Sequence, residues 1–224
     1  MRPRHKKHLE ERIANADEHL LKLDKPEKNF AEANANKEYI NFSEVFGNDN
    51  PVDLEIGSGM GGFAIEYAKN NPERNLVAIE IVRDVLVVAL EKLKGERLKN
   101  LVFISIAAEY LPKFFAPDSV ENVYLNFSTP FPKKSYAKKR LTSERFLLSY
   151  KDVLKNGGKI VQKTDNVPLF EFSLESLTCA GYEIAFKTFD MYAGDTTGNI
   201  ATEYEKKFVE SGTKICKLIA INVK

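Results

Sequence analysis

Asp53-Leu-Glu-Ile-Gly-Ser-Gly-Met-Gly-Gly62 is the stretch that decides the fold of this chain. A strand expected over residues 52–56 runs into a glycine-rich turn, and a helix is expected over residues 62–71. Glycines let such a turn bend tightly and let a ligand approach the backbone beside the start of the next helix. The stretch therefore predicts the first strand–turn–helix unit of an α/β protein.

Strand and helix patterns alternate after this unit. Strands are expected over residues 76–81, 101–106, 120–127, 159–163, 182–188 and 214–222. Helices are expected near residues 83–95, 143–154, 167–179 and 203–211, with a short turn or helix near 108–115. Ser143 is the expected N-cap of one helix, and Asn156-Gly157-Gly158 is expected to end it. This order predicts an α/β fold with a mostly parallel sheet and helices on both faces.

The first 50 residues differ from this pattern. They begin with a basic tail over residues 1–8, continue into a predicted helix near 9–23, and remain polar up to about residue 50. We therefore expect a basic N-terminal arm and helical segment over 1–50, followed by the main domain over 51–224. The net charge of the 224 residues is only +1, so contact with a nucleic acid would need local basic patches.

Composition excludes several classes of protein. Cys179 and Cys216 are far apart in the sequence and are expected to be reduced thiols of a cytoplasmic protein. No apolar run is long enough to cross a membrane, and no signal peptide is visible. All three histidines, His5, His8 and His19, precede the α/β pattern. A Ser-His-Asp hydrolase or a histidine-ligated metal site is therefore not expected in the main domain, and no metal is expected.

The sequence of the glycine turn is compatible with either of two cofactors. Gly57, Gly59 and Gly62 satisfy the G-x-G-x-x-G pattern of nicotinamide-dependent dehydrogenases. Glu80 ends the next strand, where a carboxylate holds a ribose diol of either cofactor. The negative charge of Glu55 favours the ammonium group of a methionine moiety and disfavours a pyrophosphate beside it. The pattern resembles S-adenosylmethionine-dependent methyltransferases, while a dehydrogenase or a purely structural turn remains open.

A second informative stretch runs from Val123 to Thr142. An apolar strand leads into a turn stiffened by two prolines, and a basic run without an acidic residue follows. Active sites of open α/β sheets lie at the carboxyl ends of strands, so this loop is expected to join an active site to a phosphate-binding surface. A solvated lysine-rich loop is the alternative. The basic residues are Lys133, Lys134, Lys138, Lys139 and Arg140.

Three segments make the resemblance to one family specific. These are Leu125-Asn-Phe-Ser-Thr-Pro-Phe-Pro-Lys-Lys134 with Lys139-Arg-Leu-Thr142, then Lys163-Thr-Asp-Asn166, and Thr202-Glu-Tyr-Glu-Lys-Lys-Phe208. Their order and spacing resemble bacterial tRNA (guanine-N7-)-methyltransferases over residues 50–222, and the start Met1-Arg-Pro-Arg4 is also similar. The resemblance implies a doubly wound, mostly parallel seven-stranded sheet of Rossmann-like methyltransferase type with the last strand antiparallel. It also implies S-adenosylmethionine as methyl donor and N7 of a guanine in the variable region of tRNA as acceptor, and leaves monomer or homodimer open.

The resemblance assigns roles residue by residue. It implies a catalytic role for Asp165 and for the position of Thr129. The implied cofactor residues are Glu55, Gly57, Gly59, Gly61, Glu80, Ala107 and Asn126. The implied substrate residues are Lys133, Lys134, Lys138, Lys139, Arg140, Asp165, Thr202 and Glu205.

Two positions depart from the family pattern. The chain has Thr129-Pro-Phe131 where the family has Asp-Pro-Trp, and Ala107 where the family has an aspartate near the adenine. Loss of two carboxylates predicts slower turnover rather than none. The alternative is a non-catalytic relative that binds RNA or cofactor.

Structural explanations stay open for several of these residues. Lys163 to Asn166 is also typical of a polar turn. Thr202 and Glu205 also form the pattern of an N-cap and capping box. Phe131 fits either a core contact that anchors the loop or a platform on which a base stacks.

Overall fold

The computed structural model of the chain describes residues 6–224. In this part of the chain the strands form a seven-stranded sheet in the order β3-β2-β1-β4-β5-β7-β6. The pairs β1–β2, β2–β3 and β4–β5 are parallel, whereas β7 is antiparallel to β5 and β6. The expected fold class is therefore confirmed. The strands are β1 Val52–Ile56, β2 Asn75–Ile79, β3 Leu101–Ile104, β4 Val120–Asn126, β5 Leu154–Thr164, β6 Tyr182–Thr188 and β7 Cys216–Asn222.

The chain packs as two compact units, one ending at Phe114 and one starting at Phe115. The first unit contains β1, β2 and β3 with α1 Leu9–Ala14, α2 Phe30–Ala35, α3 Phe42–Phe46, α4 Gly62–Asn70, α5 Arg83–Lys92 and α6 Leu111–Phe114. Every residue of β1 and β2 is buried, as expected for parallel strands covered on both faces. Both strands end at the glycine loop, because β1 leads directly into it and the Gly57 N–H donates to the carbonyl of Ile79, the last residue of β2.

The helix expected over 9–23 is wrong in length. The α-helix ends at Ala14, and a single 3-10 turn, Asp17–His19, follows. Leu20 then pairs with Phe103 of β3, and the Leu21 N–H donates to the Phe103 carbonyl at 2.9 Å. The chain leaves the helix because its backbone groups join the edge of β3.

The polar segment before residue 50 contains two short helices, α2 and α3. Asn29 and Asn41 cap α2 and α3 with their side chains, which is a common way to satisfy the first free N–H groups of a helix. The N–H of Glu38 donates to the carbonyl of Lys113 at 2.9 Å. Such local asparagine caps were a usable signal that the sequence prediction missed.

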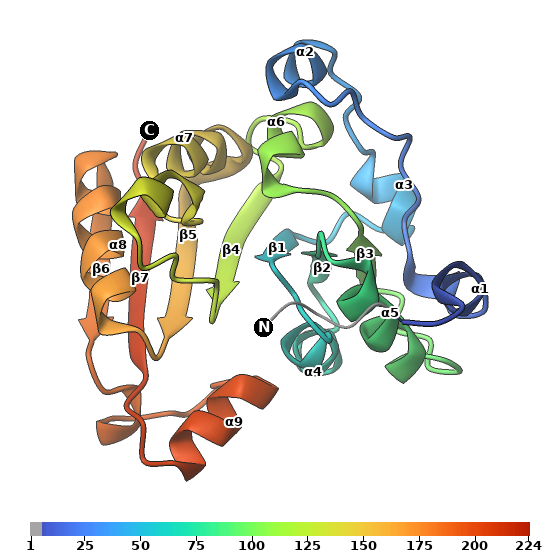
Figure 1. Cartoon of the computed structure of the whole chain (residues 1–224). Helices are drawn as coiled ribbons and strands as arrows, with labels where there is room; N and C mark the ends of the chain where they lie inside the picture. The colour runs from blue at the N-terminus through green and yellow to red at the C-terminus, as the bar shows by residue number, and fades with distance from the viewer. Residues whose placement is uncertain (1–5) are drawn as a thin grey trace. The chain divides into compact units, whose positions relative to one another are not determined.

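The second unit contains β4, β5, β7 and β6 with α7 Glu144–Val153, α8 Val167–Cys179 and α9 Glu203–Glu210. Figure 1 shows α8 beside β6 and β7 and α9 near the ends of β4 and β5 that the arrowheads mark. Asn166 caps α8 by accepting from the Leu169 N–H at 2.9 Å. This unit therefore presents the ends of two parallel strands, each followed by a polar loop.

Two expectations near α7 are corrected. Asn156-Gly157-Gly158 does not end the helix, because α7 stops at Val153 and the triplet lies inside β5. The pairing of β4 with β5 shifts register between Val120 and Asn122, and Gly157 has φ 77°. Glycine tolerates the positive φ that the chain adopts at this irregularity in the strand. Ser143 stands at the N-cap position, but its hydroxyl donates to the Lys138 carbonyl at 3.0 Å instead of capping.

Candidate active site

The glycine loop after β1 is shaped by left-handed backbone. Gly57 and Gly59 have φ 79° and 57°. The N–H groups of Gly57 and Ser58 both donate to the Ile79 carbonyl, at 2.9 and 3.0 Å. A methyl group built on Gly57 or Gly59 would meet no atom within 4 Å. The loop is thus tied to β2 on one side and open on the other.

Gly61 has a different reason to be glycine. Its φ is 75°, and a Cβ there would lie 2.7 Å from the Cβ of Ala89 in α5. This separation is far below van der Waals contact. Gly61 therefore lets the start of α4 pack against α5.

Glu80 links the glycine loop to the end of β2. One carboxylate oxygen accepts the Gly59 N–H at 2.9 Å, and the other accepts the Val82 N–H at 2.8 Å. A carboxylate offers about four acceptor sites, so lone pairs remain for further donors. Glu55, near the end of β1, is 2% exposed, and Ala107, which follows β3, is half-buried. The structure directly joins Gly59 and Glu80 among the expected cofactor residues.

The other carboxylate of β1 is structural. Asp53 is fully buried and accepts both Nε and Nη2 of Arg74, at 2.6 and 2.8 Å, and the hydroxyl of Tyr67. A bidentate pair of this kind fixes geometry strongly. The two acidic residues of β1 therefore differ in role, which their spacing in the sequence does not reveal.

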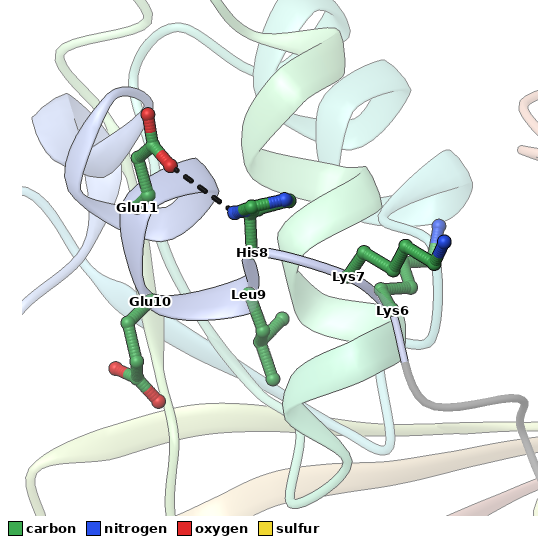
Figure 2. A pocket seen from close by; sticks show the side chains of 6 residues that line it. All are labelled: Lys6, Lys7, His8, Leu9, Glu10 and Glu11. Atoms are coloured by element: carbon green, nitrogen blue, oxygen red, sulfur yellow. Dashed lines mark ion pairs between the residues drawn. The ribbon is translucent and has the colours of Figure 1, made fainter.

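The N-terminal segment is attached to the start of α5. The Lys6 N–H donates to Asp84 Oδ1 at 2.5 Å, and Arg83 pairs with Glu10 through two bonds of 2.6 and 2.7 Å. Figure 2 shows the surface hollow lined by residues 6–11, where His8 faces Glu11 at 3.6 Å. The motif Met1 to Arg4 lies outside the described residues. None of the residues expected to bind cofactor or substrate lines this hollow.

In the second unit, the loop after β4 is held by Arg140. Its Nε donates to the Pro130 carbonyl at 3.0 Å and its Nη2 to the Phe131 carbonyl at 3.1 Å, while the guanidinium lies 4.4 Å from the centre of the Phe172 ring. Phe131 is half-buried with φ 42°. Arg140, expected to contact substrate, here fixes the loop. Thr129 is exposed on the same loop.

The neighbouring lysines are different from Arg140. The side chains of Lys133, Lys134 and Lys138 are exposed and make no ion pair or hydrogen bond with the described residues. Lys139 places its ammonium 4.5 Å from the centre of the Tyr136 ring. The structure therefore leaves three uncompensated positive charges on the turn Lys134–Lys139 and its N-cap Lys133.

The motif after β5 divides into structural and available groups. Lys163 points to α9, Thr164 Oγ1 accepts the Asn166 N–H at 3.1 Å, and Asn166 caps α8. The carboxylate of Asp165 is half-buried and has no hydrogen-bond or ion-pair partner within residues 6–224. The turn interpretation holds for the neighbours of Asp165, while its own carboxylate stays available.

Thr202 and Glu205 form the capping box that the sequence allowed. Thr202 Oγ1 accepts the Glu205 N–H at 2.9 Å, and the Glu205 carboxylate accepts the Thr202 N–H at 3.4 Å. Glu205 is also fully buried and 2.5 Å from Lys163 Nζ. The sequence showed the box but gave no sign of this ion pair.

The sequence did not indicate two further residues of this network. Tyr192 and Asn199 both donate to Glu205 Oε1, at 2.9 and 2.7 Å. Burial, followed by the hydrogen bond to Glu205, raises the pKa of Tyr192 to about 12. Tyr192 and Asn199 lie 13 and 6 positions before Glu205, in the irregular segment between β6 and α9, so no periodic pattern marked them.

The described part of the chain contains neither a metal-binding cluster nor a membrane-spanning helix. Within residues 6–224, no group of three or more His, Cys, Asp or Glu side chains is arranged to hold a metal ion. None of the helices in this range has the length and apolar character needed to span a bilayer. Cys179 and Cys216 are free thiols.

Several solved methyltransferases share this fold. The 16S rRNA methyltransferase KamB superposes with a TM-score of 0.62 at 18% identity, covering 84% of this chain and 96% of that one. The aminoglycoside resistance methyltransferase NpmB1 gives 0.56 at 19% identity, covering 81% and 92%. At these identities the likeness concerns the fold alone. The fold is that of the methyltransferases with a doubly wound sheet.

Sequence comparison identifies the family. A protein-family model described as "Putative methyltransferase" matches residues 49–218 of the chain. A tRNA (guanine-N(7)-)-methyltransferase of Bacillus cytotoxicus is 42% identical over 220 residues, covering 98% of this chain and 96% of the relative. The chain belongs to the family of bacterial tRNA (guanine-N7-)-methyltransferases, and the resemblance inferred from its motifs is confirmed.

Proposed function

We propose that this protein transfers a methyl group from S-adenosylmethionine to N7 of a guanine in the variable region of tRNA. The observation that carries this proposal is the 42% identity, over nearly the full length of both chains, to a tRNA (guanine-N(7)-)-methyltransferase. The two compact units hold complementary groups of residues that suit the two substrates.

The first unit suits the methyl donor. Gly57 and Gly59 leave open space where side chains would otherwise stand, so a ligand can lie against their backbone. Glu80 retains acceptor capacity for ribose hydroxyls, and Glu55 supplies negative charge for the ammonium of a methionine moiety. Gly61 and Ala107 complete the proposed cofactor residues of this unit, and Asn126, at the end of β4 in the second unit, is the remaining one. When bound, S-adenosylmethionine supplies a methyl group on a positively charged sulfur.

The second unit suits the acceptor. Guanine N7 carries a lone pair and no proton, so the protein needs no base at that atom. Its task is to align N7 for in-line displacement and to offset the positive charge that the purine gains. We assign to Asp165, whose carboxylate has no hydrogen-bond or ion-pair partner within residues 6–224, the role of accepting the N1–H and amino protons of guanine. The histidine-poor composition agrees with such chemistry.

The exposed lysines suit the tRNA backbone. Lys133, Lys134 and Lys138 present ammonium groups without compensating carboxylates, which is the arrangement that phosphate contact requires. We place Lys139 beside them and assign Arg140 to shaping the loop. We further propose that residues 1–50 act as an N-terminal arm to the methyltransferase domain over 51–224, and that the protein works in the cytoplasm, where tRNA is found.

Thr129 and Ala107 bear on the rate. A hydroxyl at position 129 keeps a hydrogen-bonding group but removes a negative charge, and Ala107 removes another. We therefore propose turnover slower than that of relatives with both aspartates. A non-catalytic RNA-binding or cofactor-binding relative is the alternative that these two positions motivate.

One experiment tests the proposal directly. Unmodified tRNA is incubated with the purified protein and S-adenosylmethionine, then digested and analysed by nucleoside mass spectrometry. We expect 7-methylguanosine to appear among the nucleosides, and mass spectrometry of larger tRNA fragments should locate it in the variable region. Intact tRNA binding with no 7-methylguanosine would replace the proposal with the non-catalytic alternative.

A further inference from the structure

We propose that Glu205 is a positioning residue of this reaction, which acts by holding Lys163 and does not contact the guanine. The inference rests on the proposed methyl transfer to tRNA. It gives the buried carboxylate of the Thr202–Glu205 box a role that its place in a substrate motif would not suggest.

The acceptor capacity of Glu205 is already used. Its side chain is 0% exposed. Oε2 accepts from Lys163 Nζ at 2.5 Å and from the Thr202 N–H at 3.4 Å. Oε1 accepts from the Tyr192 hydroxyl at 2.9 Å and from Asn199 Nδ2 at 2.7 Å. A carboxylate has about four acceptor sites, and four donors occupy them, so a guanine N–H would have to displace one.

Lys163 is saturated in the same way. Its ammonium donates to Glu205 Oε2, to Asn199 Oδ1 at 3.2 Å and to the Ile200 carbonyl at 2.8 Å. An ammonium has three protons, and each has an acceptor here. Lys163 is 3% exposed, so removal of Glu205 would strand a positive charge away from water.

The backbone of Lys163 connects this pair to both candidate catalytic positions. Lys163 pairs with Asn126 of β4 and Lys217 of β7, and Asp165 follows two residues later. Its carbonyl accepts the Phe127 N–H at 2.9 Å, at the start of the loop that carries Thr129. A shift of Lys163 would therefore move both loops.

Helix α9 contacts the same two strand ends through a second pair. The Phe208 ring stacks on the Phe127 ring, with centroids 5.8 Å apart and an interplanar angle of 22°. Phe127 has φ 50°, a conformation that an aromatic residue keeps only when its surroundings hold it. Through Glu205 and Phe208, α9 contacts the ends of both β5 and β4 and fixes their positions. Figure 1 shows the helix near these strand ends.

A double-mutant cycle tests the inference. Lys163→Met and Glu205→Leu are made singly and together, and kcat, the KM for tRNA and S-adenosylhomocysteine affinity are measured. Because an apolar pair replaces a buried ion pair better than a half-broken pair does, the double variant should regain activity that each single variant loses. Each single variant should lose roughly tenfold or more in kcat through misalignment, with KM and S-adenosylhomocysteine affinity little changed. A double variant no more active than Glu205→Leu would overturn the inference and indicate direct contact with guanine.

Tyr192→Phe provides a test with little risk to folding. Tyr192 is 40% exposed, and the substitution removes its hydrogen bond to Glu205 and the weaker one that its hydroxyl accepts from Asn199 at 3.4 Å. A positioning role predicts a several-fold lower kcat at unchanged KM. A carboxylate that must leave its partners to reach guanine would be released by this change, so an unchanged or higher kcat would count against the inference. Tyr39→Phe, at an exposed tyrosine in the first unit, is the matched control and should leave kcat as it is.

The wild-type assay separates the two levels of proposal. If the wild-type protein forms no 7-methylguanosine, the proposed function fails and this inference with it. If the wild type forms the product but the cycle is additive, only the role of Glu205 is refuted.

Discussion

At the scale of single residues, the partners of a carboxylate separate structural acids from available ones. Asp53 is paired with Arg74, and Glu205 accepts four donors. Asp165 has no such partner in the described part of the chain. In the sequence all three are acidic residues within motifs of the family or next to them. Only their hydrogen-bond and ion-pair partners in the folded chain show which carboxylates are structural.

Asp165→Ala should lower kcat/KM by roughly 10²-fold or more, because a group that stabilises charge in the transition state is removed. The thermal unfolding midpoint should change little, since no hydrogen bond of Asp165 is lost. Steady-state methylation assays and calorimetry measure the two quantities. Glu175→Ala, at an exposed glutamate of α8, is the control and should leave both unchanged. Near-normal methylation by Asp165→Ala would remove this residue from the mechanism.

Thr129→Asp should raise kcat several-fold, because it restores a negative charge beside a purine that becomes cationic. Thr129 is exposed, so the change should not disturb packing. Thr129→Asn keeps the shape of aspartate without its charge and should give no gain. An aspartate variant no faster than the wild type would show that the charge at this position does not limit turnover.

At the scale of secondary structure, the sequence predicted elements whose pattern is local. The strand β2 is apolar from Leu76 to Ile79, β1 alternates apolar and acidic residues before the glycines, and the glycine turn follows from its own residues. The extent of α1 was not predictable, because it depends on the pairing of Leu20 with β3. The use of Asn156-Gly157-Gly158 inside β5 depends on a register shift against β4. The Lys163–Glu205 pair joins residues 42 positions apart, and no periodicity encodes such a contact.

Gly61→Ala should destabilise the packing of α4 on α5. The new Cβ would lie 2.7 Å from Ala89 Cβ, at a residue with φ 75°. We expect a loss of about 2–4 kcal/mol in the free energy of unfolding, combining overpacking with left-handed strain. Urea denaturation measures the loss. Gly47→Ala, with φ 67° and no atom within 4 Å of its Cβ, should lose only the strain, about 1–2 kcal/mol. Equal losses for both would deny the close contact.

The 3-10 turn that follows α1 should make stability depend on pH through His19. Its Nε2 accepts the Leu98 N–H at 3.2 Å, and burial lowers its pKa from 6.5 despite the nearby Glu18 and Glu96. The unfolded chain therefore binds a proton at higher pH than the folded chain, and the free energy of unfolding should fall as pH drops below about 6.5.

The expected change is at most about 1.4 kcal/mol per pH unit for this one group. Urea denaturation at about pH 7.5 and about pH 5.5 measures it. His19→Gln can still accept the Leu98 N–H but cannot titrate, so its loss over this interval should be smaller. Identical losses in the two proteins would assign the acid sensitivity to other groups.

At the scale of the whole molecule, charge balance conceals local asymmetry. The 33 basic and 32 acidic residues nearly cancel. Some basic side chains are already neutralised by ion pairs, such as Arg12 with Glu91 and Arg83 with Glu10. Lys133, Lys134 and Lys138 have no such partner among the described residues and lie within six residues of one another, so this short segment concentrates free positive charge that can attract a polyanion.

The salt dependence of tRNA binding should therefore report on these lysines and not on the basic content of the chain. Each phosphate contact contributes about 0.7–0.9 to the slope of log K against log salt concentration. A variant with Lys133, Lys134 and Lys138 all changed to Gln should lose about two to three units of slope, as measured by fluorescence anisotropy with labelled tRNA. Arg140→Gln is the matched comparison, because its guanidinium already holds the Pro130 and Phe131 carbonyls. It should lower stability and activity while the slope stays close to that of the wild type. A slope that falls with Arg140 and not with the lysines would reverse this assignment, and tRNA would then be gripped by the residue that the free protein uses to shape its loop.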